Sequence, residues 1–132
     1  MRFITRDTDY ALRALIYMAK LKDKTATVGE IAEKENLPKV FLRRILQKLA
    51  EKKILSSSKG KSGGFALLPK PGEIKITDIM KVFQGDIDLT NCLLKGIACP
   101  NRGICSLRKK IKTINSTVIR ELDKITIKSL AG

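Results

Sequence analysis

Residues 27–52 read TVGEIAEKENLPKVFLRRILQKLAEK, and this stretch decides the fold. Thr27 and Glu30 have the spacing of a capping box, in which a hydroxyl and a carboxylate satisfy the open amides of a helix start. We therefore predict a short helix over 27–34, followed by a tight turn over 35–37.

The second half of this stretch predicts a longer helix over 38–52. Pro38 suits the first position of a helix, because its missing amide hydrogen costs nothing there. Apolar residues at helical spacing are predicted to face the core: Leu42, Ile45, Leu46 and Leu49. The residues predicted to face outward are mostly basic or polar: Lys39, Val40, Arg43, Arg44, Gln47 and Lys48. Two helices joined by a turn of a few residues, the second with a basic outer face, form a helix-turn-helix.

A β-hairpin is predicted directly after this motif. Its strands lie over 54–58 and 65–68, and the turn between them is rich in glycine and carries Lys59 and Lys61. A hairpin in this position defines a winged helix. A flexible basic hairpin can follow a DNA backbone or enter a minor groove.

Three further segments complete the predicted architecture. Apolar residues at helical spacing predict a helix over 8–22 and a short helix over 77–83, whereas 85–105 shows no period. A last long helix begins near residue 106, and its apolar residues recur at intervals of three and four: Leu107, Ile111, Ile114, Val118, Leu122 and Ile125. The fold class is therefore mainly α with a β wing: a winged helix-turn-helix with a long C-terminal helix.

The C-terminal helix predicts a homodimer. We divide the chain into a winged helix-turn-helix domain over 1–84, a cysteine-containing loop over 85–105, and a dimerisation helix with a C-terminal tail over 106–132. The apolar seam of the last helix is narrow, with basic residues beside it. Because the first helices already supply a core, we expect a second copy of the chain to cover the seam. The alternative is that the helix folds back on its own domain.

The charge of the chain favours a polyanionic partner. Its 132 residues, about one domain, carry 27 Lys and Arg against 13 Asp and Glu, a net charge of +14. Basic side chains that neutralise phosphates release counterions and so gain affinity. We expect double-stranded DNA with a palindromic site. A basic surface without a nucleic-acid partner, or a small RNA-binding or structural protein, would show the same composition.

The composition argues against an enzyme and against a membrane protein. Histidine is absent, which removes His general bases, Ser-His and Cys-His pairs and imidazole metal ligands. The GKS at 60–62 resembles the end of a phosphate-binding loop, but that pattern needs glycine where Leu55 stands and a helix where a strand is predicted. No apolar run approaches the roughly 20 residues of a membrane span, and the charged start lacks a secretory signal. We expect a cytoplasmic protein with no membrane contact.

The candidate DNA-binding residues lie on the helix over 38–52 and on the hairpin turn. An arginine such as Arg43 or Arg44 can donate two hydrogen bonds to the O6 and N7 acceptors of a guanine. The alternative is that this face contacts only phosphates or solvent. The full candidate set is Pro38, Lys39, Val40, Phe41, Arg43, Arg44, Lys48, Lys59 and Lys61.

All the cysteines lie in the loop over 85–105, spaced C-x6-C-x5-C: Cys92, Cys99 and Cys105. Classical zinc ribbons use closer pairs. Longer spacings let one loop wrap a larger object, such as an iron–sulfur cluster held by thiolates. Redox-active thiols, buried thiols and a zinc site completed by a carboxylate are the alternatives. Without histidine, the fourth ligand of a cluster must be a carboxylate, a hydroxyl oxygen or an exogenous group.

Several motifs occur together in this chain: TDYALR at 8–13, the wing motif G-x-x-GGFAL at 60–67, TDI at 77–79 and the three-cysteine loop. In combination they resemble the Rrf2 (Rrf-two) family of bacterial transcription regulators. The resemblance implies a homodimeric winged-helix repressor or activator that crosses through its long C-terminal helices. Cluster-binding members of that family sense nitric oxide, iron–sulfur status or redox state.

The resemblance also implies a ligand set. The family's cluster-ligand positions fall on Cys92, Cys99 and Cys105. Members that sense iron–sulfur status carry a histidine soon after the third cysteine, where this chain has Arg108. The aspartate of the nitric-oxide-sensing members, supplied by the opposite subunit, falls on Asp9, which implies a four-iron rather than a two-iron cluster. An acidic residue in a first helical turn is also favoured by capping and by the helix dipole, so Asp9 has a purely structural interpretation as well.

The implied function is a DNA-binding regulator whose affinity is switched by an iron–sulfur cluster. A cluster that joins Asp9 of one protomer to the loop of the other would set the positions of two recognition helices on half-sites about 34 Å apart. A thiol-based or zinc-based redox switch on the same fold is the alternative.

Overall fold

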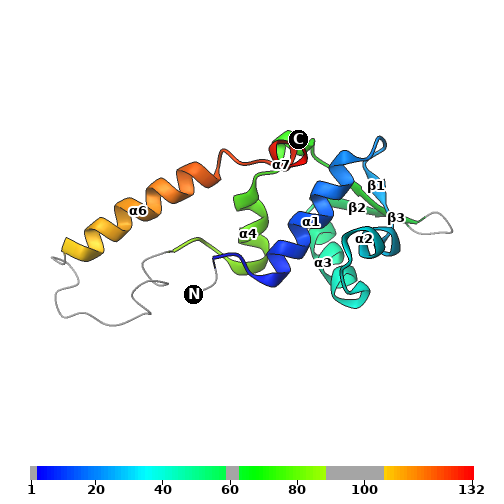
Figure 1. Ribbon diagram of the computed structural model, residues 1–132, viewed down its shortest axis with the longest axis horizontal. Helices are drawn as coiled ribbons and strands as arrows, with labels where there is room; N and C mark the ends of the chain where they lie inside the picture. The colour runs from blue at the N-terminus through cyan, green and yellow to red at the C-terminus, as the bar shows by residue number, and fades with distance from the viewer. Residues whose placement is uncertain (1–2, 59–62, 89–105) are drawn as a thin grey trace.

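The computed structural model describes residues 3–58, 63–88 and 106–132 (Figure 1). It is mostly helical, with one small three-stranded antiparallel sheet, which confirms the predicted fold class. The elements are α1 (Arg6–Lys20), β1 (Thr25–Ala26), α2 (Val28–Glu35), α3 (Lys39–Glu51), β2 (Leu55–Ser58), β3 (Gly64–Leu67), the 3-10 helix η1 (Pro71–Glu73), α4 (Ile76–Gln84), α6 (Ser106–Leu122) and α7 (Ile127–Ala131).

The helix-turn-helix forms where it is predicted. The hydroxyl of Thr27 accepts from the Glu30 amide at 3.1 Å, which is the first half of the capping box. Asn36 ends α2 in the left-handed region, at φ 54° and ψ 51°, where asparagine is tolerated. The sequence predicted Pro38 as the first residue of the helix. It is instead the N-cap of α3, because its ψ of 121° is extended.

The core face of α3 is the predicted one, and its members are buried: Leu42, Ile45, Leu46 and Leu49. They pack with the apolar faces of the other helices and with Leu55 and Phe65 of the sheet. The period of apolar residues along α3 therefore decides which of its faces is left for a partner.

The wing contains one strand more than the hairpin predicted from the sequence. Strands β2 and β3 are antiparallel, with Leu55 opposite Leu67 and Ser58 opposite Gly64. The short strand β1 pairs with the other edge of β3, so the sheet order is β1-β3-β2. A strand of two residues carries no alternating pattern, which is why the sequence did not reveal it.

Helix α1 is the centre of the molecule. It packs against α2, α3, α4 and α7. The α7 contact was not predicted: after α6 the chain returns, and Thr126 caps a short helix that lies against α1. None of the helices in the part of the chain that the structure describes is long and apolar enough to cross a bilayer.

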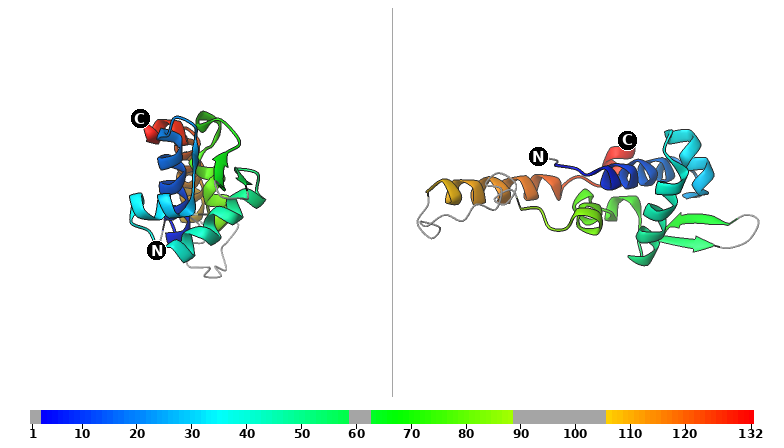
Figure 2. Two further views of the ribbon diagram at one scale, coloured as in Figure 1. Left: turned by 90° about the vertical axis from the view of Figure 1, so that its right-hand side faces the viewer. Right: turned by 90° about the horizontal axis from the view of Figure 1, so that it is seen from below.

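Helix α6 extends away from this body, as Figures 1 and 2 show. Ile111 is buried, but Leu107 is 60% exposed and Ile114 is 51% exposed. The prediction that Ile125 belongs to the same helical seam is wrong, because α6 ends at Leu122 and Ile125 packs against the core of its own chain.

The fit of β1 against β3 can be tested with one glycine of β3. An alanine Cβ at Gly64 would lie 2.8 Å from the carbonyl oxygen of Ala26, so Gly64→Ala should lower the free energy of unfolding by about 1–3 kcal/mol. Gly29→Ala is the matched control, because its Cβ would meet nothing closer than 3.9 Å and should be neutral or stabilise by about 0.4–1 kcal/mol. Urea unfolding measures both variants, and equal free energies of unfolding would contradict this packing.

Candidate nucleic-acid interface

The outer face of α3 is exposed and cationic. Six predicted DNA-binding residues of α3 are exposed: Lys39, Val40, Phe41, Arg43, Arg44 and Lys48. The other exposed residues of the helix are Gln47 and, at its last position, Glu51. In the described residues the salt bridges join Asp9 to Arg13 and Glu121 to Lys124, so the cations of α3 have no carboxylate partner there. This face is therefore free to bind an anion.

Two apolar side chains stand among these cations at the start of α3. Val40 is 81% exposed and Phe41 is 37% exposed. Such side chains can contact the methyl group of thymine in a major groove. Lys48 lies about two helical turns further along α3. Its Nζ is 5.5 Å from the centre of the Phe83 ring of α4.

A hollow of about 530 Å³ separates α3 from the wing. Lys39 and Arg43 line it from α3, Gly29 from the first turn of α2, and Ser57 and Gly64 from the two strands of the hairpin. The start of α2 presents open backbone amides, which favour negative charge. The hollow thus joins cationic side chains and amide donors on one surface, as the backbone of a nucleic acid requires.

Several predicted site residues lie outside the described residues. These are the wing lysines Lys59 and Lys61 and the three cysteines Cys92, Cys99 and Cys105. Their assignments stay predictions. Within the described residues no group of three or more Cys, His, Asp or Glu side chains is placed to hold a metal ion.

Asp9 is the one predicted metal ligand that the structure describes. It lies in the first turn of α1, and its Oδ2 accepts from Nε of Arg13 at 3.1 Å. Its side chain is 44% exposed, and it borders a surface hollow of about 480 Å³ formed with the chain before α1. Arg13 contacts Oδ2, and no partner of Oδ1 is found among the described residues, so the carboxylate fits the role of an oxygen ligand.

Gln84 is a residue of this region that the sequence did not reveal. Its Oε1 accepts from the Thr5 amide at 3.1 Å and from the Thr8 hydroxyl at 2.8 Å, and its Nε2 donates to the Phe3 carbonyl at 2.9 Å. These bonds tie the end of α4 to the start of α1. They join residues far apart in the chain, so no local sequence pattern predicts them.

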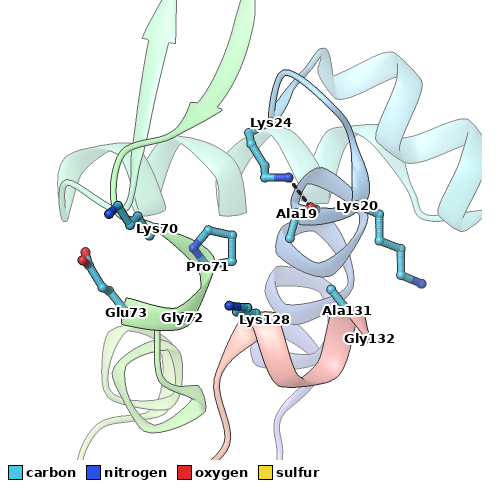
Figure 3. A pocket seen from close by; sticks show the side chains of 10 residues that line it. All are labelled: Ala19, Lys20, Lys24, Lys70, Pro71, Gly72, Glu73, Lys128, Ala131 and Gly132. Atoms are coloured by element: carbon cyan, nitrogen blue, oxygen red, sulfur yellow. Dashed lines mark hydrogen bonds between the residues drawn. The ribbon is translucent and has the colours of Figure 1, made fainter.

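A second hollow, of about 560 Å³, lies between the end of α1, η1 and α7 (Figure 3). Lys24 reaches across its edge and donates to the carbonyls of Ala19 and Leu21 at 2.7 and 2.9 Å, so its ammonium group caps α1. Figure 3 shows Lys20 directed away from the hollow. Helix α7 lies on the opposite side of α1 from α3, so this hollow is not part of the cationic face (Figure 1).

An exposed cationic helix, held beside a small β wing by a helix-turn-helix, defines a winged-helix DNA-binding protein. The chain belongs to the Rrf2 family: the family model, described as an iron-dependent transcriptional regulator, matches residues 4–132. The predicted resemblance is confirmed, and the protein is a transcription regulator by family.

Individual relatives agree with this assignment. The HTH-type transcriptional regulator NsrR of Halalkalibacterium halodurans is 29% identical over 129 residues, which cover 96% of this chain and 88% of the relative. The structure of CymR (YrzC), the global cysteine regulator of B. subtilis, matches with a TM-score of 0.83 and 25% identity, over 99% of this chain and 97% of that one. IscR of T. potens shares the fold, with a TM-score of 0.68 and 22% identity, over 98% and 85% of the two chains.

Proposed function

We propose that this protein is a homodimeric regulator, acting in the cytoplasm, that binds a palindromic duplex through α3 and whose DNA affinity is switched by an iron–sulfur cluster. The single observation that supports DNA recognition most strongly is the cationic outer face of α3, which lacks carboxylate partners within the described residues. Family membership supports the same conclusion, because the family consists of transcriptional regulators.

Arg43 is the side chain we assign to base recognition. It is exposed on α3 and lines the hollow beside the wing. A helix in this position enters the major groove, where a guanidinium group can donate to both acceptors of a guanine. Lys39 lines the same hollow from one turn earlier and is suited to a phosphate contact.

Arg43→Ala should weaken binding to the specific site by about 1–3 kcal/mol and leave binding to random duplex much less affected. Fluorescence anisotropy with both duplexes at one salt concentration measures the difference. Lys128→Ala is the charge-matched control, because Lys128 is exposed on α7, across α1 from α3. An equal loss on both duplexes would show that Arg43 contacts only phosphate.

The cluster part of the proposal is supported by three features. The family is described as iron-dependent, the cysteines have a spacing suited to a cluster, and Asp9 offers an exposed carboxylate oxygen. We assign the thiolates of Cys92, Cys99 and Cys105 and the carboxylate of Asp9 from the other subunit as ligands of a four-iron cluster. A cluster bound there would supply iron that reacts with nitric oxide or oxidants.

Asp9→Ala should make the cluster labile and leave the fold intact. Anaerobically purified wild-type protein should contain iron and acid-labile sulfide, and its visible absorption should decay on exposure to nitric oxide. In the variant this absorption should decay without nitric oxide. Asp7→Ala, in the same helical turn, is the control and should keep the wild-type lifetime.

Two results would contradict this assignment. An unchanged cluster lifetime in Asp9→Ala would assign the fourth ligand elsewhere. Wild-type protein that holds neither iron nor sulfide, even after anaerobic reconstitution, would remove the cluster from the proposal.

A thiol-based or zinc-based switch is the second candidate. The observation that favours it is the likeness to CymR, the global cysteine regulator of B. subtilis, over nearly the whole chain. The three cysteines of this chain would then act as redox-active thiols or as zinc ligands. Colourless protein with stoichiometric zinc, or DNA binding that follows thiol oxidation, would favour this candidate.

The dimer is proposed to form along α6. This helix stands away from the body and exposes Leu107 and Ile114, and a second copy of the same seam would cover both. The α4 contact and the return of the chain at 123–127 join the C-terminal end of α6 to the body, and Leu107 and Ile114 lie towards the other end of the helix.

Ile114→Glu should convert the dimer to monomers, because a carboxylate buried in an apolar seam loses its hydration without gaining a partner. Ser116→Glu is the control: it adds the same charge at an exposed position on another face of α6. Sedimentation equilibrium measures the mass of each variant. A dimeric Ile114→Glu protein, or a monomeric wild type, would contradict the α6 interface.

A further inference from the structure

The ring of Phe41 is contacted by two guanidinium groups that come from different helices. The Cζ atom of Arg6, the first residue of α1, lies 5.0 Å from the ring centre, and that of Arg44 lies 5.5 Å from it. Both distances fall within the range of a cation–π contact. The start of α1 is thereby joined to the exposed face of α3.

The two cations beside this ring have no carboxylate partner among the described residues. The salt bridges found in residues 3–58, 63–88 and 106–132 involve neither Arg6 nor Arg44, and both side chains are exposed. Two like charges beside one ring repel each other, and an anion that touches both removes the repulsion. This arrangement favours a bound anion over an empty surface.

A cation–π contact also leaves hydrogen-bond donors of the arginine available. A guanidinium group that stacks on an aromatic ring uses its face and keeps its N–H edge free. That edge matches the oxygens of a phosphate with two parallel hydrogen bonds. Arg6 is thus presented as a phosphate-binding group beside the residues of α3 that face the groove.

The turn that carries Arg6 is held in place before any ligand binds. Gln84 bonds to Thr5 and Thr8, on either side of Arg6, and the Thr8 side chain is fully buried. A contact made from a fixed turn loses less conformational entropy on binding than one made from a loose chain end. The first turn of α1, which carries Arg6, is therefore held in position before DNA binds.

We propose that Arg6 binds a phosphate of the DNA backbone next to the bases read by α3, with Phe41 as the residue that positions it. This inference rests on the proposed DNA-binding function and extends the interface from α3 to the first turn of α1. Asp9, the candidate cluster ligand, follows Arg6 by three residues in the same helix. The phosphate contact and the candidate sensor ligand are thus carried by one rigid turn.

The experiment measures the dissociation constant of the full-length protein for its specific duplex, and for a random one, over a series of KCl concentrations. Arg6→Gln should reduce the slope of log K against log salt by about 0.9 for each phosphate lost, in each protomer. Affinity for the two duplexes should fall by the same factor, because a phosphate contact carries no sequence information. Lys128→Gln removes the same charge from α7 and should leave the slope nearly unchanged.

A second variant separates positioning from charge. Phe41→Leu keeps apolar bulk but removes the ring face, so Arg6→Gln should cause a smaller loss of affinity in the Phe41→Leu background than in the wild type. Arg6→Lys keeps the charge and loses the planar guanidinium group, so it should retain the salt slope and bind more weakly. If circular dichroism shows that Arg6→Gln fails to fold, the affinity and salt slope of Arg6→Lys test the proposal instead.

The outcomes distinguish this inference from the proposed function. Wild-type binding with a steep salt slope, together with the same slope and affinity in Arg6→Gln, would overturn the Arg6 contact and leave the function of α3 in place. Additive losses in the double variant would overturn the role of Phe41. Wild-type protein that binds no duplex would overturn the proposed function itself.

Discussion

The burial of one face of α1 is the constraint on which the rest of the structure depends. Ala11, Ala14, Leu15 and Met18 expose no surface, and the neighbours of this face include α3, α4 and α7. The small side chains of the two alanines let neighbouring helices approach closely. Because three helices with different tasks share one apolar stripe, the exposed face of α3, the end of α4 and the C-terminal helix keep fixed positions relative to one another.

The first turn of α1 is polar, and it is fixed to α4 and to α3. This turn carries Arg6 and Asp9, and Gln84 fastens it to α4. The side chain of Gln84 satisfies an open amide at the helix start and a buried hydroxyl at once, so its loss would leave polar groups with fewer partners. The first turn of α1 therefore contacts α3 directly, because Arg6 lies over the ring of Phe41.

Much of the fold could be predicted because its signals are local. Thr27 and Pro38 mark helix starts, the period of apolar residues assigns the core face of α3, and runs of strand-forming residues mark the two strands of the hairpin. The return of the chain after α6 could not be predicted in this way. The spacing of apolar residues continues past the helix end to Ile125, although the helix itself stops at Leu122.

Some residues of the candidate site could be predicted from local sequence patterns, and others could not. The cationic residues of α3 were predictable, because their exposure follows from the period of the helix. Arg6 and Gln84 were not, because each acts through a partner distant in the chain: Phe41 for Arg6, and the residues before α1 for Gln84. Contacts of this kind are created by the packing of helices and leave no trace in a sequence window.

The C-terminal end of helix α6 is joined to the body by backbone hydrogen bonds just beyond the helix. At its C-terminal end the Ile76 amide donates to the Ile125 carbonyl at 3.0 Å, and the Ile127 amide donates to the Ile74 carbonyl at 2.9 Å. In a dimer paired along α6, the angle at which the two α6 helices cross would contribute to the distance between the two α3 helices. Operator geometry and base preference would then be inherited through separate parts of the chain, so that one could change during evolution while the other was conserved.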